Sequence, residues 1–147
     1  MRVQRTELRV VNRTVIHRSQ SHTRNVRPMG SDFCVGRIQL ASHLRANGLA
    51  SVDVDPRFAR QLLLKEPSDF ASGRVPLFVC ECCGDLGCGA LTVAVKRLEG
   101  EYVWSEFGYE GLDSTSISAG DYIARTGPFA FHPTAYESAL LPFARKR

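Results

Sequence analysis

Apolar and polar positions alternate most clearly in the second half of the chain. Residues 91–96 alternate strictly, and Glu99-Gly100 separates them from a second, aromatic-rich run at 102–107. Two alternating runs joined by a short glycine-containing turn predict a β-hairpin. The continuous apolar run 75–79 is typical of a buried strand, and residues 129–131 predict a short last strand.

The N-terminal pattern is less regular. Residues 5–17 are rich in β-branched side chains and predict either one strand or a hairpin that turns at Asn12-Arg13. Residues 18–32 have no periodicity and contain Pro28 and Gly30. Since these two residues interrupt regular structure, we predict a loop over about 18–32.

Three short helices are indicated by their start and stop signals. The first is expected over about 40–47, before Asn47-Gly48. The second begins at Asp55-Pro56, where a capping carboxylate precedes a proline at the first helical position. The third begins at Pro133 and is expected to stop at Pro142. The fold class predicted is α+β: a single domain over residues 1–147, with an antiparallel sheet, a C-proximal β-hairpin and two to three short helices.

Charge is distributed unevenly. Residues 1–30 contain seven arginines and one acidic residue, whereas residues 76–123 contain eight acidic residues and two basic ones. A uniformly basic chain would suggest that the partner is a nucleic acid. The segregation of basic and acidic residues indicates instead internal charge pairing, a polar surface for a protein partner, or simply solvated charges. We expect no nucleic-acid partner, no small-molecule substrate and no membrane contact. The chain contains no apolar run of membrane-spanning length and begins without a signal-peptide pattern.

Four of the five cysteines fall within nine residues, Cys80 to Cys88. This clustering is unlike a spaced disulfide framework and favours a reducing, cytoplasmic setting. Cys80-x-x-Cys83-Gly84 has the spacing of a zinc knuckle, with Cys88 as a third ligand. A fourth ligand would have to come from Cys82, Cys34, His132 or His43.

Two other interpretations of the cysteine cluster remain open. A redox dithiol would need an acidic thiol, but Glu81 and Asp85 beside the cysteines oppose thiolate formation, and no helix follows. Alternatively, the segment is a compact turn in which glycines supply unusual backbone angles and cysteines act as small buried side chains. The glycines do not form a phosphate loop, because a strand follows them where a helix would be required.

The segment Trp104 to Glu110 interleaves aromatic and acidic residues at the end of the predicted hairpin. Trp and Tyr are the commonest anchors of protein interfaces. The sequence therefore offers Asp85 and Glu106 as ion-pairing groups and Trp104 and Tyr109 as anchors for a protein partner. Trp104 and Phe107 could equally be core residues.

The residues Cys80-x-x-Cys83-Gly84-Asp85-Leu86-Gly87-Cys88-Gly89, followed by Trp104-x-Glu106-Phe107-Gly108-Tyr109-Glu110, resemble the pattern of a family of small, largely uncharacterised bacterial proteins. Proteins of that family sometimes carry an oxidoreductase label. The matching positions are Cys80, Cys83, Cys88, Asp85, Trp104, Glu106 and Tyr109. Cys82 is additional, His132 stands where the family tends to have an acid, and the arginine-rich segment up to Gly30 departs from the family pattern.

No catalytic motif is recognisable in the sequence, and we expect the chain not to be an enzyme. The leading hypothesis is a cytoplasmic protein-binding domain of the kind that serves as an immunity protein or antitoxin-like inhibitor. The alternative is a thiol- or zinc-dependent oxidoreductase or metal-binding protein that uses Cys80, Cys83 and Cys88. No cofactor other than zinc is suggested.

Overall fold

A computed structural model describes residues 3–18, 24–44, 49–50, 56–80, 89–111, 123 and 126–145. It confirms the α+β class with a main sheet that is largely antiparallel. The strands and helices follow one another in the order β1 Gln4–Thr6, β2 Leu8–Arg18, β3 Arg24–Val35, β4 Ile38–Gln39, α1 Leu40–His43, β5 Leu49–Ala50, α2 Pro56–Leu62, β6 Val75–Cys80, β7 Ala90–Leu98, β8 Glu101–Glu110, β9 Phe129–Phe131 and α3 Pro133–Ala144.

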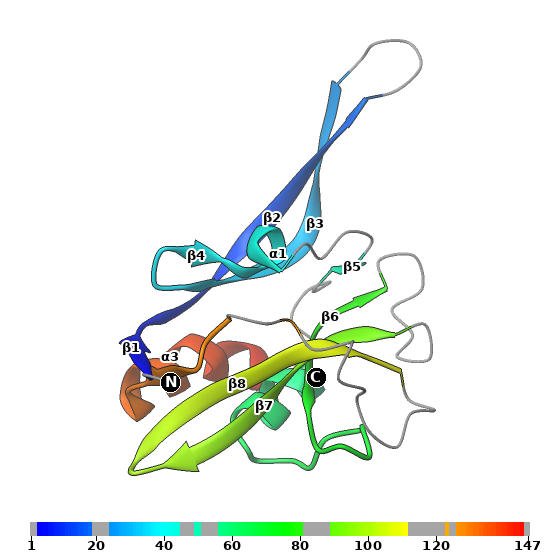
Figure 1. Cartoon of the computed structure of the whole chain (residues 1–147). Coiled ribbons are helices and arrows are strands. Elements are labelled where there is room, and N and C mark those ends of the chain that lie inside the picture. The colour runs from blue at the N-terminus through cyan, green and yellow to red at the C-terminus, as the bar shows by residue number, and fades with distance from the viewer. Residues whose placement is uncertain are drawn as a thin grey trace.

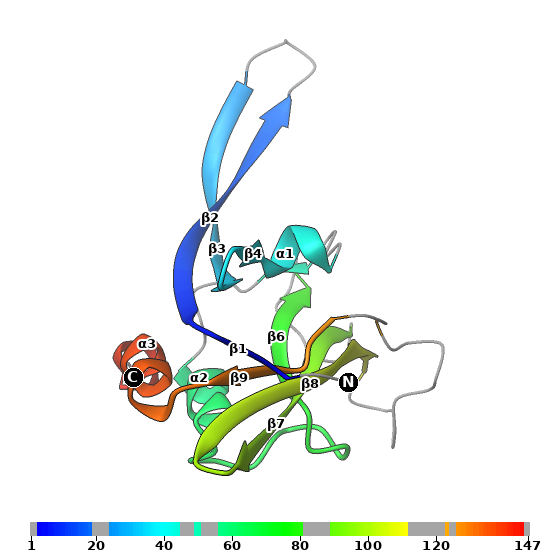
Figure 2. The same ribbon diagram turned by 60° about the vertical axis from the view of Figure 1, so that its left-hand side comes forward.

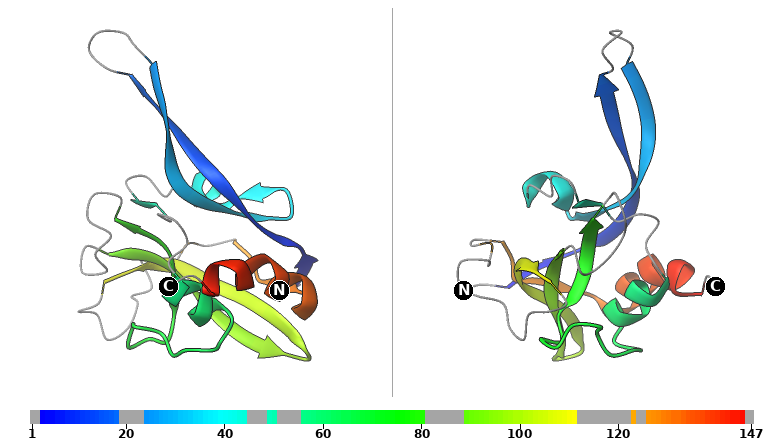
Figure 3. Two further views of the ribbon diagram at one scale, coloured as in Figure 1. Left: turned by 180° about the vertical axis from the view of Figure 1, so that it is seen from behind. Right: turned by 90° about the vertical axis from the view of Figure 1, so that its right-hand side faces the viewer.

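The strands form two sheets. The main sheet has six strands in the order β1-β9-β8-β7-β6-β5, and a second sheet has the order β2-β3-β4. All pairs are antiparallel except β1 with β9. Helices α2 and α3 pack together beside the main sheet, and the long β2–β3 ribbon extends away from the body (Figures 1 and 2). The second sheet crosses the end of the main sheet at the foot of this ribbon (Figure 3).

The central hairpin forms where the alternation predicts it. β7 and β8 pair from Leu98↔Glu101 onward, and the two residues between them, Glu99 and Gly100, both have positive φ, 51° and 80°. Positive φ at both central residues is the geometry of the turn whose twist matches that of the paired strands. The local sequence is therefore sufficient to specify this turn.

The helix starts are also confirmed, but the ends differ from the prediction. α2 begins at Pro56, and α3 begins at Pro133 after His132, whose Nδ1 accepts a hydrogen bond from the N–H of Thr134 at 3.3 Å. α3 continues through Pro142 to Ala144, because a proline in the last turn removes one backbone hydrogen bond and no following helical turn depends on it. α1 is shorter than the 40–47 expected, and residues 45–48 lie outside the described part of the chain.

The predicted loop over about 18–32 was wrong for most of its length. Arg18 ends β2, and residues 24–32 belong to β3, which pairs with β2 without a turn at Asn12-Arg13. Pro28 is accommodated because β3 has a partner on only one side there; β4 covers it only at Cys34 and Val35. The hairpin connection instead lies between Arg18 and Arg24.

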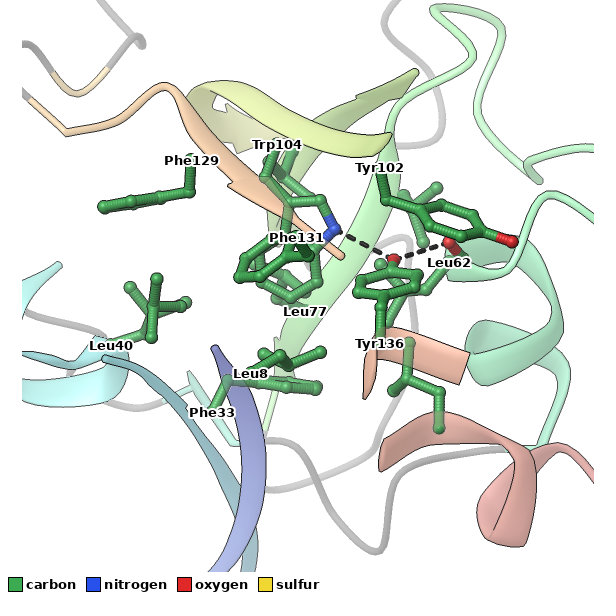
Figure 4. Packing of buried hydrophobic residues seen from close by; sticks show 14 of the residues in the cluster. Leu8, Phe33, Leu40, Leu62, Leu77, Tyr102, Trp104, Phe129, Phe131 and Tyr136 are labelled. Atoms are coloured by element: carbon green, nitrogen blue, oxygen red, sulfur yellow. Dashed lines mark hydrogen bonds between the residues drawn. The ribbon is translucent and has the colours of Figure 1, made fainter. Parts of the chain in front are cut away.

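The hydrophobic core lies between the main sheet, the α2–α3 pair and the base of the second sheet. Aromatic rings from all these parts meet there, with Trp104 near the centre (Figure 4). Phe131 and Phe33 approach its indole edge to face, at 5.1 and 5.9 Å between ring centroids. The base of the ribbon is thus part of the core, because Leu8, Phe33 and Val35 are buried in the same cluster.

Candidate functional site

The cysteine segment joins β6 to β7 at one end of the main sheet. β6 ends at Cys80 and β7 begins at Ala90, which pairs with Glu110 of β8. Residues 81–88 lie outside the described residues, and so does the side chain of Cys80. The predicted metal ligands Cys80, Cys83 and Cys88, and the predicted partner contact Asp85, therefore stay predictions.

The other candidate metal ligands outside the cysteine segment belong to different elements. Cys34 is a free, buried cysteine in β3, His43 is in α1 with its Nε2 3.4 Å from Thr126 Oγ1, and His132 caps α3. Within the part of the chain that the structure describes, no three His, Cys, Asp or Glu side chains are grouped so that they could hold a metal ion.

A buried ion pair joins Arg74, which precedes β6, to Glu110, which is paired in register with Ala90 at the start of β7. Arg74 and Glu110 have side chains 5% and 1% exposed, with Arg74 Nε 3.4 Å from Glu110 Oε1. Thr92 links them: its hydroxyl accepts from Arg74 Nε at 3.1 Å and donates to Glu110 Oε1 at 2.9 Å. Ser72 also donates to the Glu110 carboxylate, at 2.9 Å. Because both charges are paired and hydrogen-bonded, their burial costs less than the burial of either charge alone would.

Sequence reasoning missed this pair because its members are far apart along the chain. Arg74 precedes β6, whereas Glu110 ends β8, and neither belongs to a recognisable motif. Their contact depends on the pairing of β6 with β7 and of β7 with β8. Local pattern carries no signal for such a contact.

Glu106 lies at a bulge in β8. Thr92 pairs with Gly108 and Ala94 with Ser105, so Glu106 and Phe107 together face Val93. Glu106 has φ 57°, in the left-handed region usually occupied by glycine at such a bulge. Its side chain is 62% exposed, and its carboxylate lies 3.7 Å from Arg74 Nη1. The predicted ion-pairing residue is therefore at the surface and reachable.

The structure corrects the prediction that Trp104 anchors a partner. Its side chain is fully buried, and its Nε1–H donates to Tyr136 Oη at 3.0 Å. An indole with its ring enclosed and its N–H paired has no surface to offer, so its role is in the core. Tyr109 is only half-buried, and its hydroxyl donates to the carbonyl oxygen of Leu44 at 3.2 Å. Burial raises the pKa of Tyr109 above its usual value, so the phenol stays neutral at physiological pH.

The most prominent surface feature is the β2–β3 ribbon, whose first strand the sequence predicted within residues 5–17 and whose second strand was predicted to be largely a loop. The register runs without a break from Thr14↔Pro28 to Arg18↔Arg24. Along this outer part, β2 has no neighbour on its second side and neither has β3 within the described residues. The ribbon therefore extends beyond the body with both edges open (Figure 1). The alternating residues of β2 predicted a strand there. In β3, Pro28 and Gly30 interrupt the pattern and led to the prediction of a loop.

Comparison with protein-family models finds no match. Neither the curated proteins nor the solved structures contain a protein that this chain matches. The described residues include no helix of the length and hydrophobicity needed to span a bilayer.

Proposed function

We propose that this chain is a non-enzymatic, cytoplasmic domain that binds an acidic protein partner, and that the β2–β3 ribbon is its binding arm. The single observation that carries the proposal is the ribbon itself: two long paired strands that extend away from the body with both edges open (Figures 1 and 3). A role as an immunity protein or antitoxin-like inhibitor is one specific form of this proposal.

Open edges favour a protein partner. Each unpaired edge of a ribbon presents backbone N–H and C=O groups that a further extended chain can pair with. A partner strand satisfies these groups with its own backbone, whereas a nucleic-acid backbone, rich in acceptors, offers few matching donors. The proposed contact is therefore the addition of a strand to β2 or to the outer part of β3.

The charge of the ribbon favours an acidic partner. Residues 8–31 contain five arginines, Arg9, Arg13, Arg18, Arg24 and Arg27, and no acidic residue. Arg18 is paired directly with Arg24 in the register, and like charges directly opposite one another destabilise a strand pair. Such a pair is better accommodated when acidic groups approach it. The arginines also disfavour edge-to-edge pairing between copies of this chain, since like charges repel.

The acidic segment is a second place where a partner could make contact. Of the residues expected there, Glu106 is exposed and Tyr109 is partly exposed, whereas Trp104 belongs to the core. Glu106 and Tyr109 are both on β8, which belongs to the main sheet, whereas the ribbon belongs to the second sheet. We assign them a subsidiary role.

The proposal is tested with the full chain and a charge reversal in the ribbon. The wild-type protein is used to capture partners from nuclease-treated extract of its host, and a partner identified in this way is purified for a direct affinity measurement. We expect Arg18→Glu with Arg24→Glu to weaken this affinity at least tenfold, because attraction to an acidic surface becomes repulsion. The affinity should also fall as salt is raised.

The matched control is Lys65→Glu with Lys96→Glu. Both lysines are exposed on the body and the substitution changes the net charge by the same amount. The proposal requires the control to bind like the wild type. Equal loss of affinity in both double variants, capture only from extract that has not been treated with nuclease, or the absence of any captured partner would each overturn the proposal.

A second function, a thiol- or zinc-dependent activity of Cys80, Cys83 and Cys88, is favoured by one observation. Glu110, whose buried carboxylate is paired with Arg74, lies opposite Ala90, the first residue of the strand that follows the cysteine segment. Cys83→Ser separates the two functions: partner binding survives the substitution, whereas zinc content or a thiol-dependent turnover is lost.

A further inference from the structure

A concave pocket of about 500 Å³ lies at the foot of the ribbon. Its lining consists of Arg9, Cys34, Arg37, Ile38, Gln39, Ser42 and His43. Arg9, Cys34 and Gln39 are paired in register across β2, β3 and β4 and so form one row across the second sheet. Leu8, Phe33 and Val35, which alternate with them, are buried in the core, so the pocket is on the sheet's outer face.

Two features hold the polar groups of the pocket in place. Arg37 lies in the two-residue turn between β3 and β4, where Gly36 has φ 60° and donates its N–H to the Glu7 carbonyl oxygen at 2.8 Å. Asp32 ties helix α1 to β3, because its Oδ1 accepts from the N–H of Ala41 at 3.0 Å and from that of Phe33 at 2.7 Å. The guanidinium of Arg37 and the side chains of α1 are thus presented from anchored backbone.

The pocket is lined by cations without a carboxylate among its lining residues. Neither Arg9 nor Arg37 forms an ion pair with any acidic side chain in the part of the chain that the structure describes. Asp32, the nearest acidic residue to Cys34 along β3, is buried with its Oδ1 bound to two backbone N–H groups. Two arginines that line one concave surface with no carboxylate among its lining residues create a site for an anion.

We propose that this pocket binds a small molecule that carries a phosphomonoester group. Arg9 and Arg37 would hold the phosphoryl oxygens through paired N–H donors, as guanidinium forks do. Ser42 and His43, the last two residues of the short helix α1, add further polar groups to the lining. A pocket of about 500 Å³ is larger than a phosphate ion and falls within the usual range of small-molecule sites. Ile38 and the buried Cys34 supply an apolar wall for the organic part.

A phosphoryl group fits better than a carboxylate. Two guanidinium groups together present ten N–H donors, by the usual inventory of about five per arginine. A phosphomonoester offers three terminal oxygens and up to two charges, whereas a carboxylate offers two oxygens and one charge. The excess of donors and of positive charge over what one carboxylate can satisfy favours the phosphoryl group. This inference does not depend on the proposed protein partner, since Arg9 is the only one of the five ribbon arginines among the pocket's lining residues.

The test is a titration of the full-length, isotopically labelled protein with phenyl phosphate, followed by NMR and by calorimetry. Phenol and benzoate are the matched probes, because they keep the ring and remove the phosphoryl group or replace it with a carboxylate. We expect saturable binding of phenyl phosphate with shift changes clustered at the backbone amides of Arg9, Cys34 and residues 37–43. Benzoate should bind at least about tenfold more weakly and phenol should not bind.

The variant Arg9→Gln/Arg37→Gln removes both cations from exposed positions, and Lys65→Gln/Lys96→Gln removes two exposed cations elsewhere. We expect the first variant to raise the dissociation constant of phenyl phosphate at least tenfold and the second to leave it unchanged. Thermal unfolding of both variants checks that each remains folded. Equal binding of benzoate, an unaltered dissociation constant in Arg9→Gln/Arg37→Gln, shift changes spread over Arg13, Arg18, Arg24 and Arg27, or no saturable binding would each overturn the proposal.

Discussion

The indole N–H of Trp104 donates to the hydroxyl oxygen of Tyr136 at 3.0 Å, and this hydroxyl in turn donates to the carbonyl oxygen of Leu62 (Figure 4). Both side chains are buried. The chain of two hydrogen bonds joins the main sheet, α3 and the C-terminal end of α2, and it satisfies every polar group that these two aromatic side chains bring into the core.

Removing the shared hydroxyl should therefore cost stability. In Tyr136→Phe the indole N–H and the Leu62 carbonyl oxygen lose a partner inside the core, and each unsatisfied group costs about 1–3 kcal/mol. We expect the free energy of unfolding, measured in urea, to fall by roughly 2–4 kcal/mol in total. Tyr102→Phe is the control: its hydroxyl donates to the partly exposed Glu137, so we expect a loss below about 1 kcal/mol. Similar losses in the two variants would contradict this explanation.

The same tyrosine predicts a dependence of stability on alkaline pH. Burial raises the pKa of Tyr136 above the ordinary value of 10.0, so the folded protein retains this proton at pH values where the unfolded chain releases it. The contribution is complete below pH 10 and is lost as the pH rises from there towards the folded pKa. Above pH 10 the wild type should lose about 1.4 kcal/mol per pH unit more than Tyr136→Phe does. Parallel curves of unfolding free energy against pH for the two proteins would exclude this effect.

The buried ion pair predicts that the two carboxylates that share Arg74 contribute very differently to the free energy of unfolding. Arg74→Met leaves the Glu110 carboxylate buried without its cation, which should lower the free energy of unfolding by about 3–5 kcal/mol. Glu106→Gln removes only an exposed partner of the same guanidinium, and we expect a change of about 0–1 kcal/mol. The double variant Arg74→Met/Glu110→Met should recover part of the loss. A double variant less stable than Arg74→Met would show that the pairing is not the cause.

We predict that replacing Gly36, in the turn that positions Arg37, lowers stability because an added side chain would collide with Thr6. Its φ is 60°, and a Cβ added there would lie 2.5 Å from Thr6 Oγ1. Gly100 has φ 80° with no atom near the added Cβ, so Gly100→Ala should lose only the conformational cost of about 1–2 kcal/mol. Gly36→Ala should lose more than Gly100→Ala in thermal or urea unfolding. The excess should largely disappear in a Thr6→Ala background, and its persistence there would count against the collision as the cause.

Several elements could be predicted because the information that specifies them is local. The turn at Glu99-Gly100, the helix starts at Pro56 and Pro133, and the α+β class follow from residue types within a few positions of one another. Turn geometry and helix capping act over the same short distance, so neighbouring residues are enough to indicate them.

The candidate sites were less accessible to prediction. Glu106, offered as an ion-pairing group for a partner, is exposed. Trp104 was offered as an anchor but is buried, because residue type alone does not distinguish an interface aromatic from a core aromatic. The strand that contains Pro28 was predicted to be a loop, since the sequence does not reveal that one side of β3 is unpaired there. The arginines of the pocket, Arg9 and Arg37, are 28 positions apart and become neighbours only through the pairing of β2, β3 and β4.

The amino-acid sequence by itself determined the fold class, the central hairpin and the points where α2 and α3 begin, because each depends on interactions between residues close along the chain. Only the tertiary structure decided which aromatic residues are buried, which charges meet and which strands keep an open edge. Those properties depend on contacts between distant segments, and such contacts exist only after the strands have paired and the helices have packed on them.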